Sequence, residues 1–501
     1  MLLIYRNFVR FKSTFFINLI GLSTGLACTL FIYLWVNDEL HIDKFHEKDN
    51  RLFQAMERRQ DADGILVNDK TAGPVAQTLI QEMPEVEYAA AVMHYSGFPN
   101  SILSAQEEHK IKAIGQFASE DYFQVFSYNL IQGNDKNVLR DKKSIVISEK
   151  LARQLFNSTQ NVVGKTLTWE MGPFKQPVMV SGVFKDIPAN SSEQFDFLLS
   201  FEAYKSNAPW ALNWENDGTH TYVVLKEGAN VTQFNQKISN FLASKNAGAN
   251  RTLFLKPYSD KYLYGHYENG VQSGGRIVYV KLFSIIAVFI LVIACINFMN
   301  LSTAKAARRI KEVGVKKVIG ASRVTLIGQY LGESLLMAFI ALSVAILLVG
   351  LFLPAFNQIT GKQLTLPINA PVILTSLGIA LLTGLMAGSY PALYLSGFAP
   401  ATVLKGKLPS SVGEIFIRQG LVVFQFSLSV ILIVAVLVVY KQIEYIQTKQ
   451  LGYDKDNIIF FVKDGKLYQN QEAFLAAVKN TPGIINAASV GRSIIGSHNT
   501  T

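Results

Sequence analysis

The chain has few charged residues and almost no cysteine. Only 17% of its 501 residues are charged and half are hydrophobic, a balance too apolar for a soluble protein of this length. Its two cysteines, Cys28 and Cys295, both lie in apolar runs. The sequence therefore offers no disulfide framework and no indication of redox compartment. The polar segment 37–280 is long enough to form a core without cross-links.

Nucleotide and metal motifs are also missing. Gly164-Lys165-Thr166 resembles the end of a P-loop, but the glycine required five residues before Gly164 is Thr159. We expect a turn leading into a strand here. His41 and His46 are five residues apart, which does not align two ligands on one helical face, and the other histidines are scattered. No cofactor or metal is therefore expected in this chain.

Five apolar runs are long enough to cross a bilayer as helices. They cover residues 15–36, 281–304, 326–356, 371–395 and 421–440. The first is too long for the apolar region of a signal peptide and lacks a clear small-residue cleavage site, so we expect an uncleaved anchor.

The distribution of Lys and Arg predicts the orientation. Basic residues cluster before the first run, between the second and third, and between the fourth and fifth, whereas the third-to-fourth link has only Lys362. By the positive-inside rule the basic loops are cytoplasmic. The expected cytoplasmic segments are 1–14, 305–325 and 396–420, and the expected outer segments are 37–280, 357–370 and 441–501.

The net charge of +10 points to a membrane surface rather than to nucleic acid. Residues 37–280 carry 25 basic and 29 acidic side chains, so the positive excess lies beside the apolar runs. No chain of ionisable residues crosses the expected bilayer, which gives proton-coupled transport little support.

The outer segment reads as a mixed α+β domain. We expect strands at 144–148, 178–184 and 221–225, and helices at 149–156 and 231–243, from β-branched runs and from helical apolar spacing. Strands and helices do not alternate regularly, so a doubly wound parallel sheet is not predicted. The predicted fold class is a membrane protein with five α-helical transmembrane segments, a large α+β extracytoplasmic domain and the start of a second one.

A weak internal repeat links the two outer segments. Residues 83–92, MPEVEYAAAV, match residues 481–490, TPGIINAASV, at Pro, Ala and Val positions. The fifth apolar run then corresponds to the first. This predicts that the sequence is an N-terminal fragment of a protein of about 800 residues.

Small residues four apart occur in two of the apolar runs. Such pairs let helix backbones approach closely, although they also arise by chance in glycine-rich membrane helices. We expect tight helix packing at Gly21 and Gly25 in the first run and at Gly384 and Gly388 in the fourth.

The segment ARRIKEVGVKKVIGASR, residues 307–323, is strongly basic, with six Lys or Arg among seventeen residues. On a helix, one face would carry Lys305, Arg308, Arg309, Glu312 and Lys316, and another Ile310, Val313, Gly314 and Val318. Gly314 and Gly320 each weaken a single helix by about 1 kcal/mol, so two short pieces with a bend are expected. A lipid anchor needs only the charge, whereas docking to a cytoplasmic partner also needs the apolar face and the glycines.

This segment resembles the signature of the FtsX/MacB-type ABC transporter permeases. The matches to that signature are Arg309, Lys311, Glu312, Gly314, Lys317, Gly320, Ala321, Ser322 and Arg323. DELHIDKFHEKDNRLFQ after the first run, VVGKTLTW and VSGVFKDIP in the outer segment, and AGSYPALYLSGFAP at the fourth run are also similar to such permeases.

The resemblance implies a permease subunit that is not itself an enzyme. A separate cytoplasmic ABC ATPase, carrying ATP and Mg²⁺, would dock beneath the segment and move the MacB-like outer core domain mechanically, for efflux or for lipoprotein or peptide handling. The implied coupling residues are Arg308, Arg309, Lys311, Glu312, Gly314, Lys316, Lys317, Gly320 and Arg323.

The resemblance also implies a multi-pass protein of the bacterial inner membrane. Membrane lipids would surround it, and it leaves room for a periplasmic adaptor or a homodimer partner. The alternative is a membrane-anchored sensor or regulator, such as a regulator of a cell-wall hydrolase, whose outer domain binds a ligand.

Overall fold

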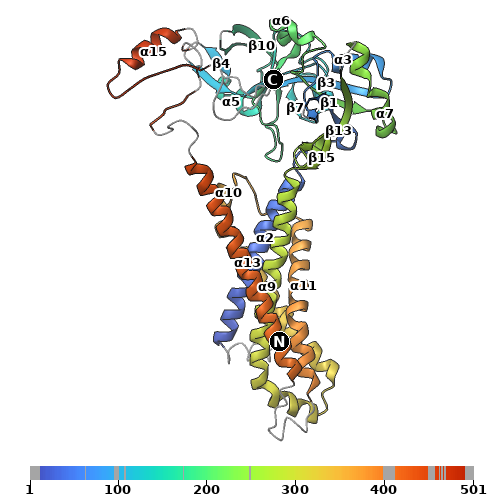
Figure 1. Ribbon diagram of the computed structural model, residues 1–501, viewed down its shortest axis with the longest axis vertical. Helices are drawn as coiled ribbons and strands as arrows, with labels where there is room; N and C mark the ends of the chain where they lie inside the picture. Colours follow the sequence, from blue (N-terminus) through green and yellow to red (C-terminus); the bar gives the residue numbers. More distant parts are fainter. Residues whose placement is uncertain are drawn as a thin grey trace. The chain divides into compact units, whose positions relative to one another are not determined.

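A computed structural model describes residues 12–62, 64–94, 101–106, 109–172, 174–246, 250–398, 412–449, 457–461, 463, 467 and 470–490. The chain divides into two compact units. The helical unit comprises residues up to 40 and residues 278–456, and the sheet unit comprises residues 41–277 and the C-terminal residues from 457 (Figure 1).

The helical unit contains five helices that are long and apolar enough to cross a membrane, as the sequence predicts. Each extends beyond its predicted apolar run. They are α2 (Lys12–Leu40), α9 (Ile277–Val318), α10 (Arg323–Thr360), α11 (Ala370–Gly397) and α13 (Val412–Thr448).

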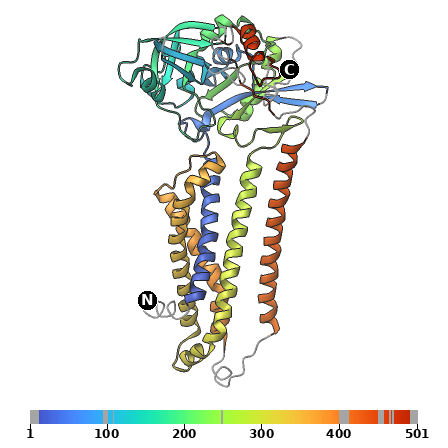
Figure 2. The same cartoon turned by 90° about the vertical axis from the view of Figure 1, so that its left-hand side faces the viewer.

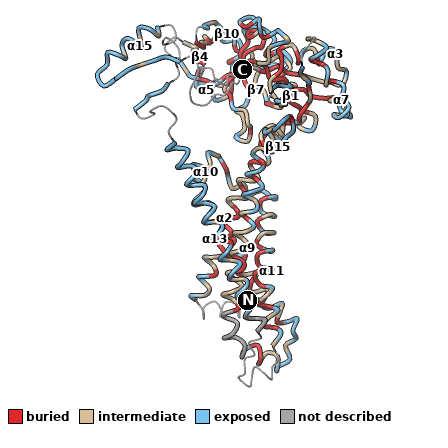
Figure 3. Tube along the Cα trace, viewed as in Figure 1, coloured by how far each residue is buried: buried red, intermediate tan, exposed pale blue. Residues whose placement is uncertain are grey.

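Helix α10 packs against both α2 and α11 (Figure 2). Their shared core includes Leu26 of α2 and Ala338 of α10. Helix α13 is different, because nearly all of its described side chains are exposed (Figure 3). Its apolar surface is therefore left for lipid or for another helix.

Lys362, in the loop between α10 and α11, is paired with two carboxylates. The Lys362 ammonium lies 2.8 Å from Asp38 Oδ2 and 2.7 Å from Glu39 Oε1 at the end of α2. Glu39 is only 3% exposed in its side chain. The triad ties the α10–α11 loop to the end of α2.

The four glycines expected at helix contacts all face a neighbouring helix. A Cβ on Gly25 would lie 2.6 Å from Ala294 Cβ, and one on Gly21 would lie 3.2 Å from Asn297 Nδ2, so both face α9. On α11, a Cβ on Gly384 would lie 3.0 Å from the Cα of Leu335 in α10. These approaches are closer than a side chain permits without displacement.

Gly388 gives the sharpest test of this packing. A Cβ there would lie 2.6 Å from Ser334 Cβ on α10, so we expect Gly388→Ala to lower the free energy of unfolding by about 1–3 kcal/mol. Gly378 on the same helix faces open space, and Gly378→Ala should not lower it. Denaturant titration of the detergent-solubilised chain measures both variants. Equal stability of the two would show that the α10–α11 contact tolerates a methyl group.

The sheet unit is built on a mixed, mostly antiparallel sheet of thirteen strands. Its main order is β13-β1-β12-β3-β6-β11-β8-β10-β9-β4-β5, with β2 beside β1 and β7 beside β10. The strands are β1 (Leu52–Asp61), β2 (Gly64–Asn68), β3 (Val86–His94), β4 (Ser101–Gln106), β5 (His109–Ala113), β6 (Gly115–Ala118), β7 (Leu130–Gln132), β8 (Ser144–Ser148), β9 (Thr166–Met171), β10 (Phe174–Phe184), β11 (Phe197–Ser200), β12 (His220–Leu225) and β13 (Arg251–Pro257). A separate hairpin joins β14 (His266–Glu268) to β15 (Val271–Gly274).

Both faces of the sheet are covered, because successive side chains of a strand point to opposite faces. In β8, Ile145 and Ile147 belong to one core cluster and Val146 to the other. The short helices of the unit are α3 (Val75–Glu82), α4 (Tyr122–Val125), α5 (Glu149–Phe156), α6 (Phe201–Asn207), α7 (Val231–Ile238) and α8 (Phe241–Lys245), with 3₁₀ turns η1 (Asp49–Arg51), η2 (Pro209–Leu212) and η3 (Tyr258–Asp260).

Most predicted elements are confirmed, including the strand at 144–148 and the helix at 149–156, whose N-terminus is capped by the Ser148 hydroxyl. The helix expected over 231–243 is wrong, because α7 ends at Ile238 and α8 begins at Phe241. The irregular order of strands and helices correctly excluded a doubly wound parallel sheet.

The two copies of the internal repeat agree only in the short helix that precedes them. In the first copy, α3 ends at Glu82, just before Met83, and β3 follows from Val86. In the second, α15 (Gln471–Lys479) ends just before Thr481, and residues 484–490 follow without a strand assignment. The helix thus occupies corresponding positions in both copies.

Candidate functional site

The predicted coupling segment covers the end of α9 and the turn that joins α9 to α10. Helix α9 continues without interruption through Gly314 to Val318, so the expectation of two short helical pieces is wrong. The chain turns instead at Gly320, whose φ of +104° favours glycine. Ser322 then caps α10 by accepting a hydrogen bond from the Thr325 amide at 3.2 Å.

One side of this turn is buried against the helical unit. Val313 is fully buried in a small cluster with Leu326 and Tyr330 of α10 and with Ala392 and Leu395 of α11. Gly314 is buried as well. The prediction that Val313 and Gly314 belong to an apolar face left for a partner is therefore wrong, because both face the protein's own helices.

Two lysines of the segment hold the turn in place. The Lys317 ammonium donates to the carbonyl oxygens of Ser396 and Phe398, at 2.7 and 2.6 Å, and so caps the C-terminus of α11. Lys316 forms an ion pair with Glu312 at 3.0 Å and donates to Gln329 of α10 at 3.2 Å. These two charges are committed to contacts within the chain.

The opposite side of the turn presents apolar side chains to solvent. We call this group the turn patch; its members and exposed fractions are Val315 (49%), Val318 (62%), Ile319 (80%) and Val324 (78%). Gly320 and Arg323 are exposed beside it. The side chains of Arg308, Arg309 and Lys311 lie outside the described part of the structure.

The turn patch lies beyond the apolar part of α9. The apolar run of that helix ends at Ala304, before Lys305, and Val318 follows fourteen residues later. At 1.5 Å per residue this places Val318 roughly 21 Å further along the helix axis. Apolar groups exposed there are more typical of a protein contact than of a headgroup anchor.

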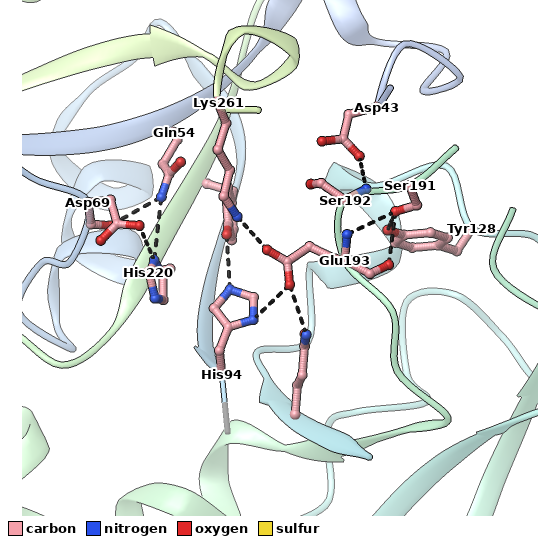
Figure 4. A network of polar contacts seen from close by, with 12 residues as sticks. Asp43, Gln54, Asp69, His94, Tyr128, Ser191, Ser192, Glu193, His220 and Lys261 are labelled. Atoms are coloured by element: carbon pink, nitrogen blue, oxygen red, sulfur yellow. Dashed lines mark hydrogen bonds and ion pairs between the residues drawn. The ribbon is translucent and has the colours of Figure 1, made fainter. Parts of the chain in front are cut away.

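A second group of functional interest lies within the sheet unit, and sequence spacing did not reveal it. Figure 4 shows the Lys261 ammonium against the Glu193 carboxylate, with His94 Nδ1 3.3 Å from Glu193 Oε2. His94 Nε2 lies 3.0 Å from the Tyr222 hydroxyl. Among the described residues, His94 Nδ1 lies near the carboxylate but has no hydrogen-bond partner, whereas Nε2 is paired with the phenol.

The second histidine of the network stacks edge-on against the first. The rings of His94 and His220 have centroids 4.4 Å apart, although 126 positions separate them in the sequence. His220 Nδ1 lies 3.4 Å from Gln54 Nε2 and 3.7 Å from Asp69 Oδ2. The antiparallel pairing of β3 with β12 brings them together, which spacing alone could not predict.

Burial is the main cause of the shifted pKa values of the two histidines in this network. It lowers the pKa of His94 to about 4 and that of His220 to about 3, so both are neutral at pH 7. Burial works to raise the pKa of Glu193, but His94 and Lys261 together bring it well below its usual value. The network is thus a buried structural element of the sheet unit.

Two further sequence patterns have structural explanations. Gly164 adopts φ +89° in the turn before β9, so Gly164-Lys165-Thr166 is a turn, as expected. Residues 21–25 have Gly-x-Ser-x-Gly spacing but lie inside α2, where the Ser23 hydroxyl donates to Ile20 O at 3.1 Å. A nucleophile elbow requires a strand-to-helix turn instead. Among the described residues no cluster of three His, Cys, Asp or Glu side chains could hold a metal ion.

The helices and the sheet unit define a protein with five candidate membrane-spanning helices and a large α+β domain. Residues 15–241 match the family model of the MacB-like periplasmic core domain, and residues 284–400 match the FtsX-like permease C-terminal model. The chain belongs to the MacB/FtsX-like ABC transporter permeases.

Curated relatives agree with this assignment. The macrolide export ATP-binding/permease protein MacB of Salmonella typhimurium is 25% identical over 57% of this chain and 42% of its own length. The uncharacterized ABC transporter permease YknZ of Bacillus subtilis is 25% identical over 48% of this chain and 57% of its own length. The chain thus spans about half the length of these relatives.

Two solved structures also match the chain. A domain of a putative permease from Porphyromonas gingivalis is 26% identical, with a TM-score of 0.36, over 42% of this chain and 93% of that domain. The periplasmic region of MacB from Actinobacillus actinomycetemcomitans is 16% identical, with a TM-score of 0.30, over 42% of this chain and 89% of that region.

The buried histidines predict how stability depends on pH. Histidine titrates near 6.5 in the unfolded chain, so the stability carried by each neutral ring is complete above that pH and is lost as the pH falls toward 4 and 3. Glu57 and Asp43 have the opposite effect on the pH dependence of stability, because burial raises the pKa of each. Comparing the pH dependence of stability between the wild type and a histidine variant isolates the contribution of one ring.

Between pH 6.5 and 4, the wild type should lose stability relative to His94→Gln by up to about 1.4 kcal/mol per pH unit. The measurement is hydrogen exchange of β3 and β12 in the detergent-solubilised chain, corrected for intrinsic rates. His266, with 62% of its side chain exposed, provides the control, since His266→Gln should leave the slope unchanged. Parallel curves for wild type and His94→Gln would contradict the assignment of a neutral buried ring.

Proposed function

We propose that this chain is the membrane-spanning subunit of an ABC transporter and that a separate ABC ATPase docks on the turn patch. The observation that carries the proposal is an apolar patch exposed on a turn whose other side is fixed to two helices. A partner that pushes on such a turn moves α9, α10 and α11 together. A loosely held loop would absorb the motion instead.

The shape of the turn favours a protein partner over a lipid anchor. Lys316 and Lys317 make contacts within the chain, so neither is free to bind headgroups. The exposed surface combines four branched apolar side chains with Arg323 at its edge. Apolar centres with a charged rim are typical of protein interfaces.

We also propose a membrane orientation for the chain and separate roles for the two subunits. The N-terminus and the turn would lie in the cytoplasm of a bacterial inner-membrane protein, and the sheet unit would lie on the outer side, in accordance with the basic loops. ATP and Mg²⁺ would be bound by the partner, and this chain would contribute no catalytic group. Its work would be efflux or the handling of a peptide or lipoprotein.

Cysteine accessibility tests the orientation. Ser206 and Ser322 are both exposed, the first in the sheet unit and the second in the turn. In a chain whose Cys28 and Cys295 are replaced, we expect an impermeant thiol reagent to label Ser206→Cys in intact cells and Ser322→Cys only after lysis. Labelling of both in intact cells would refute the orientation.

Charge placed in the turn patch tests the docking site. Ile319 is 80% exposed, so Ile319→Asp should leave folding intact, but a desolvated carboxylate in the interface should abolish co-purification of the ATPase. Mass spectrometry of the affinity-purified chain identifies the ATPase by its Walker motifs.

Ile368 provides the matched control, because it is 91% exposed but lies in the α10–α11 loop at the other end of these helices. Ile368→Asp should retain the ATPase at the wild-type level. Retention of the ATPase by Ile319→Asp would exclude the turn patch as the docking surface.

A further inference from the structure

The chain enters the sheet unit through a short segment that a distant loop holds. Residues 41–46, here called the incoming segment, directly follow α2. The Asp43 amide donates to Asn190 O at 2.9 Å, and Asp43 Oδ1 accepts from the Ser192 amide at 2.7 Å. Asn190 Nδ2 donates in turn to His41 O at 3.2 Å. Three hydrogen bonds therefore fasten the incoming segment to residues 190–192.

Asp43 is strained as well as buried. It is fully buried and has a φ of +62°, a left-handed conformation that a residue with a Cβ adopts at a cost. Such a conformation persists only where the surroundings fix it. The bonds from Asn190 and Ser192 are the contacts that fix it here.

The chain leaves the sheet unit through a second segment that the same loop holds. Residues 258–277, here called the outgoing segment, lead into α9. The Lys261 ammonium forms an ion pair with Glu193, and two residues further on Leu263 O accepts from the Ile277 amide at 3.1 Å. Gly275 packs so closely that a Cβ there would lie 2.5 Å from Leu263 O. The first residue of α9 is thus tied to the Lys261 turn.

Glu193 also anchors the loop to the middle of the sheet. Its Oε2 lies 3.3 Å from His94 Nδ1 at the end of β3 and accepts from Gln116 Nε2 of β6 at 3.4 Å (Figure 4). Both side chains of the Glu193–Lys261 pair are only 22% exposed. Removing either charge would leave the other largely desolvated and unpaired, so the loop and the outgoing segment depend on each other.

We propose that residues 190–193 form a clasp that fastens both chain connections of the sheet unit to one place, so that loosening either connection loosens the other. The two connections are more than 200 residues apart in the sequence, yet Ser192 and Glu193, which hold them, are consecutive. Its use rests on the proposed function, because a clasp of this kind would join the two chain connections within the sheet unit, so that a displacement of one connection reaches the other.

Hydrogen exchange of the full chain in detergent tests the clasp without any ATPase. Lys261→Met removes the charge that Glu193 needs, so amides in both the outgoing segment and the incoming segment should exchange about tenfold faster or more. Asp43→Ala should speed exchange in the outgoing segment by a similar factor, because coupling between two sites is reciprocal. Lys261→Arg keeps the charge and should restore most of the protection.

Two controls separate the clasp from general loosening. Glu85→Gln breaks the exposed Lys237–Glu85 pair and should change neither segment. Strand β8, buried on both faces, is the internal reference for global unfolding. If exchange in β8 is also faster in Lys261→Met, the test uses the milder variant Asn190→Ala instead. This variant removes only one side-chain hydrogen bond, to His41 O, and should speed exchange in both segments.

The proposal fails if the two segments respond independently. Faster exchange in residues 258–277 alone for Lys261→Met, or in residues 41–46 alone for Asp43→Ala or Asn190→Ala, would show two separate anchors. This outcome is distinct from failure of the proposed function, which is decided by the loss or retention of the ATPase in Ile319→Asp.

Discussion

A lysine ammonium that is removed from water needs carboxylate or carbonyl partners to compensate for its lost hydration. Three such lysines connect distant segments of this structure. Lys317 caps the carbonyl end of α11, Lys362 joins the α10–α11 loop to the acidic end of α2, and Lys261 pairs with Glu193 inside the sheet unit. In each case the partners come from a segment distant in the sequence. A hydrophobic contact could slide at such places, whereas a desolvated charge specifies one geometry.

These contacts divide the chain into parts that are expected to move together. At the turn, Lys317 links α9 to α11, and the close approach of Gly384 and Gly388 links α11 to α10. At the other ends of these helices, Lys362 links the α10–α11 loop to α2. Only α13 lacks such a link among the described residues, since almost none of it is buried. A displacement at the turn would therefore reach α2 through packed contacts, while α13 has no comparable constraint.

The sequence predicted the parts of this molecule that depend on local pattern. Five apolar helices, the strand at 144–148 and the helix at 149–156 follow from run length, β-branching and helical spacing, and each is present. Prediction from sequence failed where contacts between distant segments determine which residues are buried. Val313 and Gly314 have the right spacing for an exposed docking face, but the ends of α10 and α11 bury it. The neighbouring positions of His94 and His220 follow from strand order, which no local signal carries, and Glu193 reaches them from the loop before β11.

The basic segment also shows that some of its charges are used within the chain. Of the described basic residues in the segment, Lys316 and Lys317 are engaged by Glu312, Gln329 and the end of α11, which leaves Arg323 exposed beside the turn patch. Lys316 and Lys317 therefore contribute to the rigidity of the turn. In the proposed docking on the turn patch, recognition of the partner would depend mainly on the shape of four apolar side chains, because apolar contacts in a fixed frame discriminate by fit. A substitution that conserves charge but changes the branching at Ile319 would thus alter recognition more than one that exchanges Arg323 for Lys.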